Sequence, residues 1–498
     1  MLALLAIACT DTPAQPTENV PVLVSTTPEN GATGITSSSL SVVFTFDRYI
    51  RSSAASYKYI TVDGGASVSN VEASDKALTV TVSGLDRGVT YTITVPKGTV
   101  RSYANDETGA AEIKFKFTTR EKTDTPVTPG SWEDASTCVH NMGVGWNLGN
   151  TLDSNSGDVD NMWIEAYKQG KPSDYETAWG QPVATRELIH MFKEAGFGAI
   201  RVPVTWYPHM GNFKSSVSGT HWDVSAWTTN NVDPAWMDRV EEVVNYVLDE
   251  DMYCILNVHH DTGTYTTSWL RADKTVYNNV KDRYADLWTQ IATRFNGYGE
   301  KLVFEGFNEM LDAQGTWNYS TNDAHEAINM YNALFVQTVR ATGGNNASRN
   351  LILNTYAAAP TQQALTAYRL PEDSAQNHLI AEVHSYAPYI FAFDNPNQKT
   401  VFDSACESEV KGIVDGMNTY LVSKGIPCIL GEFGTDSRAL AETELAKQAK
   451  CYVSNATKYG IACFYWMILS EAEDRSVPKW STPTLKDAIL KAYNDNKK

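Results

Sequence analysis

Two glutamates far apart in the chain have the residue type that paired acid–base and nucleophilic chemistry needs. Glu309 ends the apolar run LVFEGFNE, and Glu432 lies within CILGEFG. One neutral and one ionised carboxyl group can together cleave a glycosidic bond, since one protonates the leaving oxygen while the other attacks the anomeric carbon. We expect Glu309 to be the acid/base and Glu432 the nucleophile, with the carboxyl groups about 5 to 5.5 Å apart.

Other polar or aromatic residues end neighbouring apolar runs and could assist such a pair. They are Asn147, Asn150, Arg201, Asn257, His259, His260, Asn308, His384, Tyr386 and Trp466. Arg201 and the Tyr386 hydroxyl could keep the nucleophile ionised. Asn308 has the length to hydrogen-bond a sugar hydroxyl, and Trp466 offers an apolar plate for the ring. Any one of these residues could instead be a buried, hydrogen-bonded structural residue, but that alternative is strained for the whole set.

These residues can meet only if the fold brings the ends of many strands together. Eight short apolar runs occupy residues 143–150, 199–206, 253–260, 302–309, 351–356, 379–386, 428–434 and 461–468. Between them lie amphipathic segments with apolar residues at three- and four-residue steps, such as 184–196, 234–250 and 323–342. This alternation predicts an α/β fold, a (β/α)8 TIM barrel over residues 132–498, whose strand ends converge on one face. An open doubly wound sheet is the alternative, but no glycine-rich phosphate loop follows the first run.

The N-terminal part follows a different pattern. Short β-rich runs alternate with turn residues over 21–119, which predicts a small all-β sandwich, and REKTDTPVTPGS at 120–131 is typical of a linker. The opening PVLVSTTPENGATGI and the closing KFKFTT resemble bacterial Ig-like domains, used as spacers or as sugar-binding modules.

Residues 1–20 read as the remnant of an export signal and a polar tether. Leu5–Cys9 resembles the lipobox of bacterial lipoproteins, in which the cysteine is lipidated. We therefore expect possible membrane anchoring through Cys9 and an exported protein, either a cell-surface or periplasmic lipoprotein or a secreted one.

Composition narrows the range of partners. The 498 residues include 58 acidic and 40 basic side chains, for a formal charge of −18, without a Lys/Arg cluster that could follow a phosphate backbone. We expect no nucleic-acid partner. Beyond Cys9, the cysteines at 138, 254, 406, 428, 451 and 463 form no CxxC pair and no zinc-type spacing with histidine, so we expect no metal. We expect no cofactor either, because an acid, a nucleophile and water are sufficient for the hydrolysis. Disulfides cannot be paired from the sequence. We also expect a monomer.

The ordered blocks GVGWNLGNTLDS, ETAWGQP, IRVPVTW, ILNVHHD, FEGFNEM, VHSY, LGEFG and YWMI resemble glycoside hydrolase family 5, the retaining cellulase family. The resemblance implies Glu309 as acid/base and Glu432 as nucleophile. It implies active-site roles for Arg201, His259, Asn308, His384, Tyr386 and Trp466, and we add Asn150, Trp179 and His260 as further substrate-binding candidates. It also implies an endo-acting β-1,4-glucanase, with β-linked polysaccharide as the partner.

Several alternatives remain open at this point. Met310 stands where many relatives carry proline, so xyloglucan, mixed-linkage glucan and mannan stay possible substrates. Trp163, Trp179, Trp269 and Trp317 could line further sugar subsites or could simply pack. A metal-dependent barrel enzyme built on His259, His260, Asp261, Glu309 and His384 is the rival from another class. A non-catalytic sugar-binding adhesin is the rival without turnover.

Overall fold

The computed structural model describes residues 20–35, 39–86, 88–104, 109–119, 132–211, 217–218, 221–222, 229–317, 320–436, 440–466 and 478–497. The predicted lipobox with Cys9, almost all of the predicted tether and the predicted linker lie outside these residues. The chain divides into two compact units, Met1–Thr123 and Asp124–Lys498, and each is described by itself. Within the described ranges, the structure has no helix with both the length and the apolar character to cross a bilayer.

The N-terminal unit consists of two four-stranded sheets, ordered β1-β3-β6-β5 and β2-β8-β7-β4. The strands are β1 (Leu23–Thr27), β2 (Ala32–Ile35), β3 (Ser39–Phe46), β4 (Thr61–Val62), β5 (Ser67–Ser74), β6 (Ala77–Ser83), β7 (Thr90–Val95) and β8 (Ile113–Thr119). Alternate residues of β6, β7 and β8 are buried, because successive side chains of a strand point to opposite faces. The inward residues form one apolar core between the sheets. The predicted all-β sandwich is confirmed.

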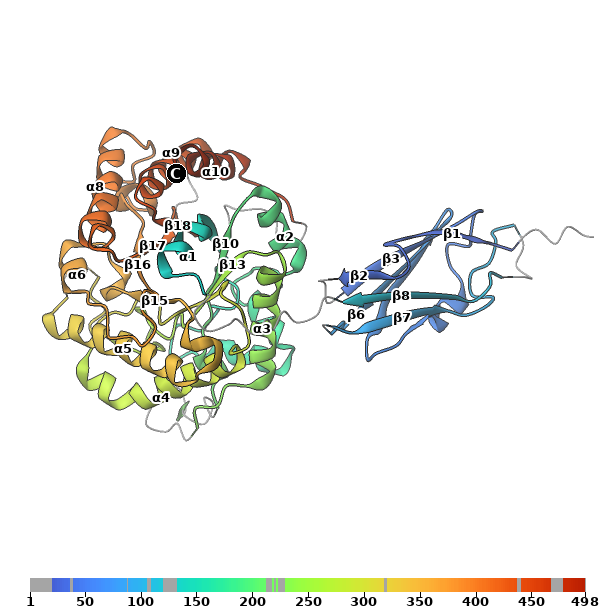
Figure 1. The fold of residues 1–498 in the computed structure, drawn as a ribbon, viewed down its shortest axis with the longest axis horizontal. Coiled ribbons are helices and arrows are strands. Elements are labelled where there is room, and N and C mark those ends of the chain that lie inside the picture. The colour runs from blue at the N-terminus through green and yellow to red at the C-terminus, as the bar shows by residue number, and fades with distance from the viewer. Residues whose placement is uncertain are drawn as a thin grey trace, which may run out of the picture. The chain divides into compact units, whose positions relative to one another are not determined.

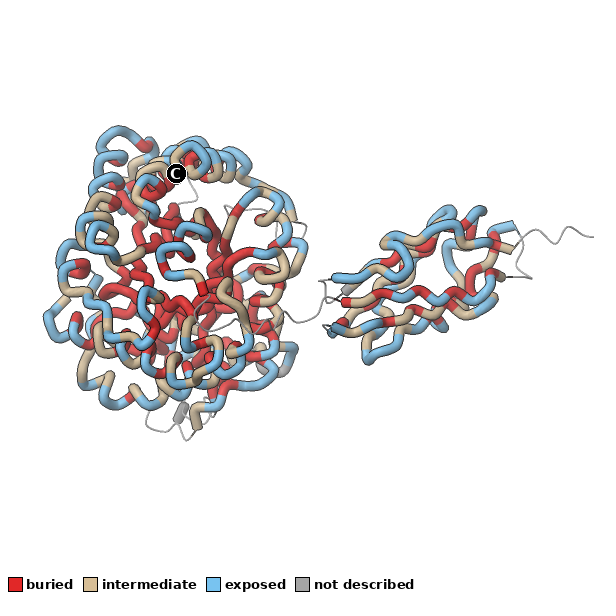
Figure 2. Tube along the Cα trace, in the orientation of Figure 1, coloured by how far each residue is buried: buried red, intermediate tan, exposed pale blue. Residues whose placement is uncertain are grey.

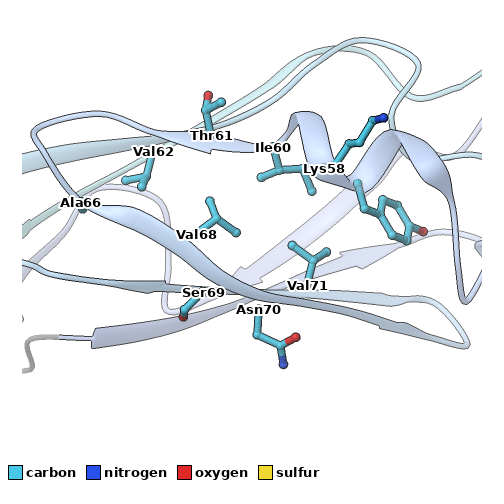
Figure 3. A pocket seen from close by; sticks show the side chains of 10 residues that line it. Lys58, Ile60, Thr61, Val62, Ala66, Val68, Ser69, Asn70 and Val71 are labelled. Carbon is cyan, nitrogen blue, oxygen red and sulfur yellow. The ribbon is translucent and has the colours of Figure 1, made fainter. Parts of the chain in front are cut away.

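The sequence of strand β5, SVSNVEAS, is too polar to be recognised as a β-rich run. The strand pairs with β6 at the edge of its sheet, where one face and one edge meet water. A groove of about 540 Å³ lies along β5 (Figure 3). Its other side is formed by the 3-10 helix Ala55–Tyr59 and by β4, which follows that helix. Val62, Val68 and Val71 line the groove, and none of the predicted site residues does.

The C-terminal unit is built around a closed barrel of eight parallel strands, in the order β10-β13-β14-β15-β16-β17-β18-β9 (Figure 1). The strands are β9 (Val144–Asn147), β10 (Ala199–Val202), β13 (Tyr253–Asn257), β14 (Leu302–Glu305), β15 (Leu351–Asn354), β16 (Leu379–Ser385), β17 (Cys428–Phe433) and β18 (Ala462–Trp466). Each strand lies inside one of the eight predicted runs. The predicted TIM barrel is confirmed, and the open doubly wound sheet is wrong because β18 pairs with β9 and closes the ring.

Helices surround this barrel. The main ones are α2 (Arg186–Ala195), α3 (Pro234–Asp249), α4 (Lys274–Arg294), α5 (Asn322–Ala341), α6 (Gln362–Ala367), α8 (Ser404–Tyr420), α9 (Glu442–Lys458) and α10 (Pro483–Asn496). Polar caps begin several of them: the side chain of Thr321 accepts a hydrogen bond from Ala324 N in α5, and Asp403 does so from Ala405 N in α8. Figure 2 shows buried strands inside and exposed outer helix faces, as the amphipathic pattern predicts.

The N-terminal end of the barrel is closed by helix α1 (Ala135–Met142), which lies over the centre of the strand ring in Figure 1. Its Ala135, Cys138, Val139 and Met142 pack in one cluster with inward residues of the strands, among them Ile255, Val303, Ile352, Ile380 and Ile429. The six cysteines of the described residues are all free, and those at 254, 428 and 463 are buried as apolar residues. This end of the interior is therefore a packed apolar layer.

Candidate active site

The opposite, C-terminal ends of the strands carry the polar residues. In a parallel barrel these ends share one face, so residues separated by hundreds of positions become neighbours. Arg201 of β10 lies at the centre of this face and is fully buried. Its guanidinium forms two hydrogen bonds with the carboxylate of Glu305, at 2.6 and 2.7 Å, and one with each of Asn147 and Asn308, at 3.0 and 2.9 Å.

Arg201 also contacts the predicted nucleophile. Its Nη1 donates to Glu432 Oε1 at 2.7 Å, while the Tyr386 hydroxyl donates to Glu432 Oε2 at 2.8 Å. Burial lowers the pKa of Arg201, but the negative charges of Glu305, Glu382 and Glu432 more than offset this and raise that pKa well above its usual value. The guanidinium is therefore a permanent positive charge beside Glu432.

Glu432 is buried, and burial raises its pKa above the ordinary value. The positive charges of His384 and Arg201 and the Tyr386 hydrogen bond oppose that rise, while Glu309 adds to it. Both oxygens of Glu432 accept hydrogen bonds, which favours the ionised form.

His384 connects the two glutamates. Its Nδ1 lies 2.9 Å from Glu309 Oε1 and 3.6 Å from Glu432 Oε2, and its Nε2 lies 3.2 Å from Glu382 Oε1. One carboxylate oxygen of Glu309, one of Glu432 and a ring nitrogen of His384 all lie within 4.8 Å of one another. Glu309 and Glu432 are thus neighbours on this face, each in contact with the same imidazole.

A second group of predicted residues lies beside this pair. The ring of Trp466 stacks parallel to that of His259, with centroids 5.7 Å apart, and His259 Nε2 is 4.0 Å from Glu432 Oε1. Asn257 Nδ2 lies 3.0 Å from His259 Nδ1, which orients the imidazole. Burial and the neighbouring charges of His260, Arg201 and His384 lower the pKa of His259 well below its usual value, so it is neutral.

The remaining candidates line the adjoining rim. His260 is half-buried, with its Nε2 3.7 Å from Asp153 Oδ2 and its ring 5.4 Å from that of Trp179. Trp179 donates its Nε1 hydrogen to the Asn155 carbonyl at 3.0 Å. Asn150 adopts a left-handed backbone (φ 55°), and its backbone N–H bonds to Asp153 Oδ2. Asp153 therefore holds this rim together, a role the sequence analysis missed.

The tryptophans outside this group differ in exposure. Trp163 and Trp317 are exposed, whereas Trp269 is buried and donates to Asp261 Oδ1 at 2.6 Å. Of the two alternatives that the sequence leaves open for Trp269, its burial favours packing over a sugar subsite. Asp261 also accepts from the backbone N–H groups of Trp206 and Tyr207.

These contacts weaken the rival metal site. Both oxygens of Asp261 accept hydrogen bonds from backbone or indole donors, and Asp261 belongs to neither group of possible ligands among the described residues. Among the described residues, two trios have ligand-like spacing: Asp153, His259 and His260, and Glu309, His384 and Glu432. In the second trio both ring nitrogens of His384 already face carboxylates, and the Arg201 guanidinium lies against Glu432. The absence of a cofactor stays a prediction.

Sequence reasoning missed two glutamates beneath the site. Glu305 and Glu382 lie inside the runs of β14 and β16 and are fully buried. Burial raises the pKa of Glu305 to about 7. The negative charge of Glu382 adds to this rise, and the positive charge of Arg201 opposes it. A usable signal was present, because a glutamate within an otherwise apolar strand must find a charged partner inside the fold.

A closed β/α barrel with one carboxyl group after its fourth strand and its pair near the C-terminal end of its seventh has the architecture of a barrel glycosidase. Residues 163–471 match the family described as cellulase (glycosyl hydrolase family 5), and residues 17–119 match the bacterial Ig-like domain. The chain is 33% identical to endoglucanase A of Clostridium longisporum over 400 residues, 77% of this chain and 71% of that protein.

Solved structures agree. A glycoside hydrolase family 5 enzyme from Prevotella bryantii B14 in complex with a xyloglucan tetradecasaccharide is 40% identical, with a TM-score of 0.64 over 73% of this chain and 99% of the other. A broad specificity endoglucanase from Ruminococcus champanellensis with bound cellotriose is 36% identical, with a TM-score of 0.64 over 73% and 100%. The chain belongs to glycosyl hydrolase family 5, and its barrel is preceded by a bacterial Ig-like domain. The resemblances to family 5 and to bacterial Ig-like domains are confirmed.

Proposed function

We propose that the barrel is a retaining endo-β-1,4-glucanase that uses Glu432 as nucleophile and Glu309 as acid/base. The observation that carries the proposal is the approach of the two carboxylates within 4.8 Å, each held by a positively charged or hydroxyl donor. The endoglucanase names of relatives at 33 to 37% identity support the substrate class.

In the first step Glu432 attacks the anomeric carbon while Glu309 gives its proton to the leaving oxygen. Glu432 thereby becomes an ester and Glu309 a carboxylate. In the second step water attacks the anomeric carbon, the bond from this carbon to Glu432 breaks, and Glu309 takes a proton from the water, so Glu432 is released as a carboxylate. Two inversions give retention of the anomeric configuration.

Surrounding residues support this sequence of steps. Arg201 and Tyr386 hydrogen-bond Glu432, so they hold the nucleophile ionised and aimed before attack. Arg201 donates to the amide oxygen of Asn308, so the amide nitrogen is the group that would face a sugar hydroxyl beside the reacting carbon. The parallel rings of His259 and Trp466 provide an apolar wall for the sugar ring.

We propose β-1,4-linked glucan as the backbone that is cleaved, with xyloglucan as the second candidate. The xyloglucan complex of the Prevotella bryantii relative and the cellotriose complex of the Ruminococcus champanellensis relative favour these two substrates. Reducing-end assays on carboxymethylcellulose, xyloglucan, mixed-linkage glucan and glucomannan would rank them. Activity on mannan alone would overturn the proposal.

The catalytic assignment is tested with Glu432→Gln and Glu309→Gln. Each should lower kcat by about 10⁴-fold or more, a loss typical for a residue of a catalytic unit, while a short glucan oligomer still binds by calorimetry. ¹H NMR of the first product should show the β-anomer. Full activity of either variant, or an initial α-anomer, would refute the assignment, and loss of activity with EDTA that metal restores would favour the metal rival.

We also propose that the protein is exported and anchored through a lipidated Cys9, as the lipobox-like Leu5–Cys9 indicates. Labelled palmitate should be incorporated into the wild-type chain and not into Cys9→Ser. If neither the wild type nor Cys9→Ser incorporates label, the lipid anchor is refuted and secretion without an anchor is the remaining proposal.

A further inference from the structure

Glu382 lies directly beneath the paired glutamates, and the mechanism above gives it no role. It stands two residues before His384 on β16, so both side chains point to the barrel interior. Its Oε1 is 3.2 Å from His384 Nε2 and 3.5 Å from Arg201 Nε. Its other oxygen has no hydrogen-bond partner among the described residues. All polar contacts of this carboxylate are therefore made by one oxygen.

The space for this carboxylate depends on Gly431, the residue before the nucleophile. A Cβ at position 431 would overlap Glu382 Oε1, so only glycine leaves room for it. The pairing of β16 with β17 shifts at the same point, because Val383 pairs with Leu430 and His384 with Glu432. This bulge leaves Gly431 without a partner on β16 and moves Glu432 toward His384.

Glu382 acts on a histidine whose two ring nitrogens both face carboxylates. Nδ1 lies 2.9 Å from Glu309 Oε1, and Nε2 lies 3.2 Å from Glu382 Oε1. Only the imidazolium can donate from both nitrogens. Burial lowers the pKa of His384, but Glu432, Glu309 and Glu382 together raise it to about 10.

The charged and titratable groups around His384 come from several strands. They are Arg201 from β10, His259 after β13, Glu309 after β14, Glu382 from its own strand, Glu432 from β17 and Tyr386 after β16. The positive charge of Arg201 opposes a charge on His384, His259 is neutral, and the three glutamates favour the charge. Of those three, Glu309 and Glu432 change charge during the proposed reaction.

We propose that Glu382 is a positioning residue that keeps His384 doubly protonated, with its Nδ1–H aimed at Glu309, through both steps of the reaction. The inference rests on the proposed function. Before attack, Glu432 carries the negative charge and Glu309 the proton. In the glycosyl-enzyme, Glu432 is an uncharged ester and Glu309 is the carboxylate. Glu382 is the one carboxylate at His384 that takes part in neither the proton transfer nor the ester formation, so its contact with Nε2 is the same in both states.

Glu382→Gln tests this with little change in shape. The amide oxygen can take the place of Oε1, and the amide nitrogen can take that of the oxygen without a partner. Because a charge in hydrogen-bond contact is removed, we expect the alkaline limb of the kcat profile to move down by about 1 pH unit or more, with little change in KM. Glu305→Gln is the matched control. Glu305 is as deeply buried as Glu382 and also contacts Arg201, but its other partner is Asn257 and not His384. This variant should lower activity and move the alkaline limb much less.

A direct readout follows the imidazole itself. In ¹⁵N-histidine-labelled protein, His384 of the wild type should remain doubly protonated at about pH 8, above the usual range for histidine, and His384→Asn assigns its signals. Glu382→Gln should lose that protonation at the same pH.

This titration needs no turnover, so it separates the two proposals. Absence of polysaccharide cleavage together with the expected titration would refute the proposed function and leave the role of Glu382 in holding the proton. A neutral His384 in the wild type at neutral pH would overturn the inference, even if Glu382→Gln failed to fold. An unchanged titration and alkaline limb in a folded Glu382→Gln would overturn it equally.

Discussion

The two ends of the barrel interior are formed by the same strands but hold opposite kinds of side chain. Near the N-terminal ends, Ile255, Val303, Ile352 and Ile380 pack with helix α1. Two residues further along each strand, the inward positions are Asn257, Glu305, Asn354 and Glu382, all fully buried. A single step of the strand period thus separates an aliphatic layer from a charged one.

The difference shows how a barrel can hold so many buried charges. Removing carboxylates from water costs several kcal/mol each, and only paired, hydrogen-bonded charges recover that cost. Arg201 and His384 provide the pairing, while the aliphatic layer and α1 provide apolar burial that contributes about 25 cal/mol per Å². The charged layer therefore serves chemistry, and the aliphatic layer stabilises the fold that holds it.

Removing the central cation should break the charged layer most severely. Arg201→Leu leaves Glu305, Glu382 and Glu432 without their main partner, so we expect a loss of about 3–5 kcal/mol in the free energy of unfolding and complete loss of turnover. Urea unfolding and reducing-end assays measure the two effects.

Arg349 is the matched control, because it is fully buried at the start of β15 but donates to Asn346 and to backbone carbonyls, such as those of Phe295 and Leu302. Burial and Arg340 lower its pKa to about 9. Arg349→Leu should also destabilise, with kcat of the folded fraction retained. Equal activity of both variants would contradict the comparison.

A cavity in the aliphatic layer should affect stability alone. Ile352→Ala removes buried methyl groups on β15, which carries no predicted site residue, so we expect a loss of about 2–5 kcal/mol. Ile352→Val is the graded control and should cost about 0.5–1.5 kcal/mol. Thermal and urea unfolding measure both, and a large fall in kcat at temperatures where the protein is folded would show that the layers are not separable.

Filling the space beside Glu382 should disturb the charged layer more mildly. Gly431→Ala places a Cβ against Glu382 Oε1, and overpacking of this kind costs about 1–3 kcal/mol. Because the backbone at 431 also leads to Glu432, kcat should fall as well. Gly412→Ala in α8 is the control: its Cβ would meet no atom within 4 Å, and the change should slightly stabilise the helix. Wild-type activity of Gly431→Ala would show that the space is not needed.

The smallest expected effect is on the pH dependence of stability. The pKa of Glu305 is raised from 4.5 to about 7, so the native state binds more protons than the unfolded state in that interval. Stability should therefore fall as pH rises through it. The pKa of His384 is raised from 6.5 to about 10, so this residue should also make stability fall as pH rises between these two values. In Glu305→Gln, the fall in the free energy of unfolding between pH 4.5 and about 7 should be smaller by on the order of 1 kcal/mol. Urea unfolding at several pH values measures it. An unchanged slope would contradict the shift at Glu305.

Much of this architecture could be read from the sequence, because it depends on local pattern. The β runs and amphipathic segments alternate in a way that few folds allow. Glu309 ends its run, and Glu432 lies near the C-terminal end of its own. The burial of Trp269 could not be read, since a loop tryptophan gives no periodic signal. Strand β5 was missed because an edge strand may be almost entirely polar.

The sequence by itself determined the fold class, the family and the chemical types gathered at the strand ends, since strand and helix periodicity and ordered motifs are properties of short segments. Only the tertiary structure decided that Glu305 and Glu382 lie under the paired glutamates, that Gly431 forms a bulge, and that both nitrogens of His384 face carboxylates. Those facts depend on the register between strands, which a closed barrel fixes through pairings across the whole chain.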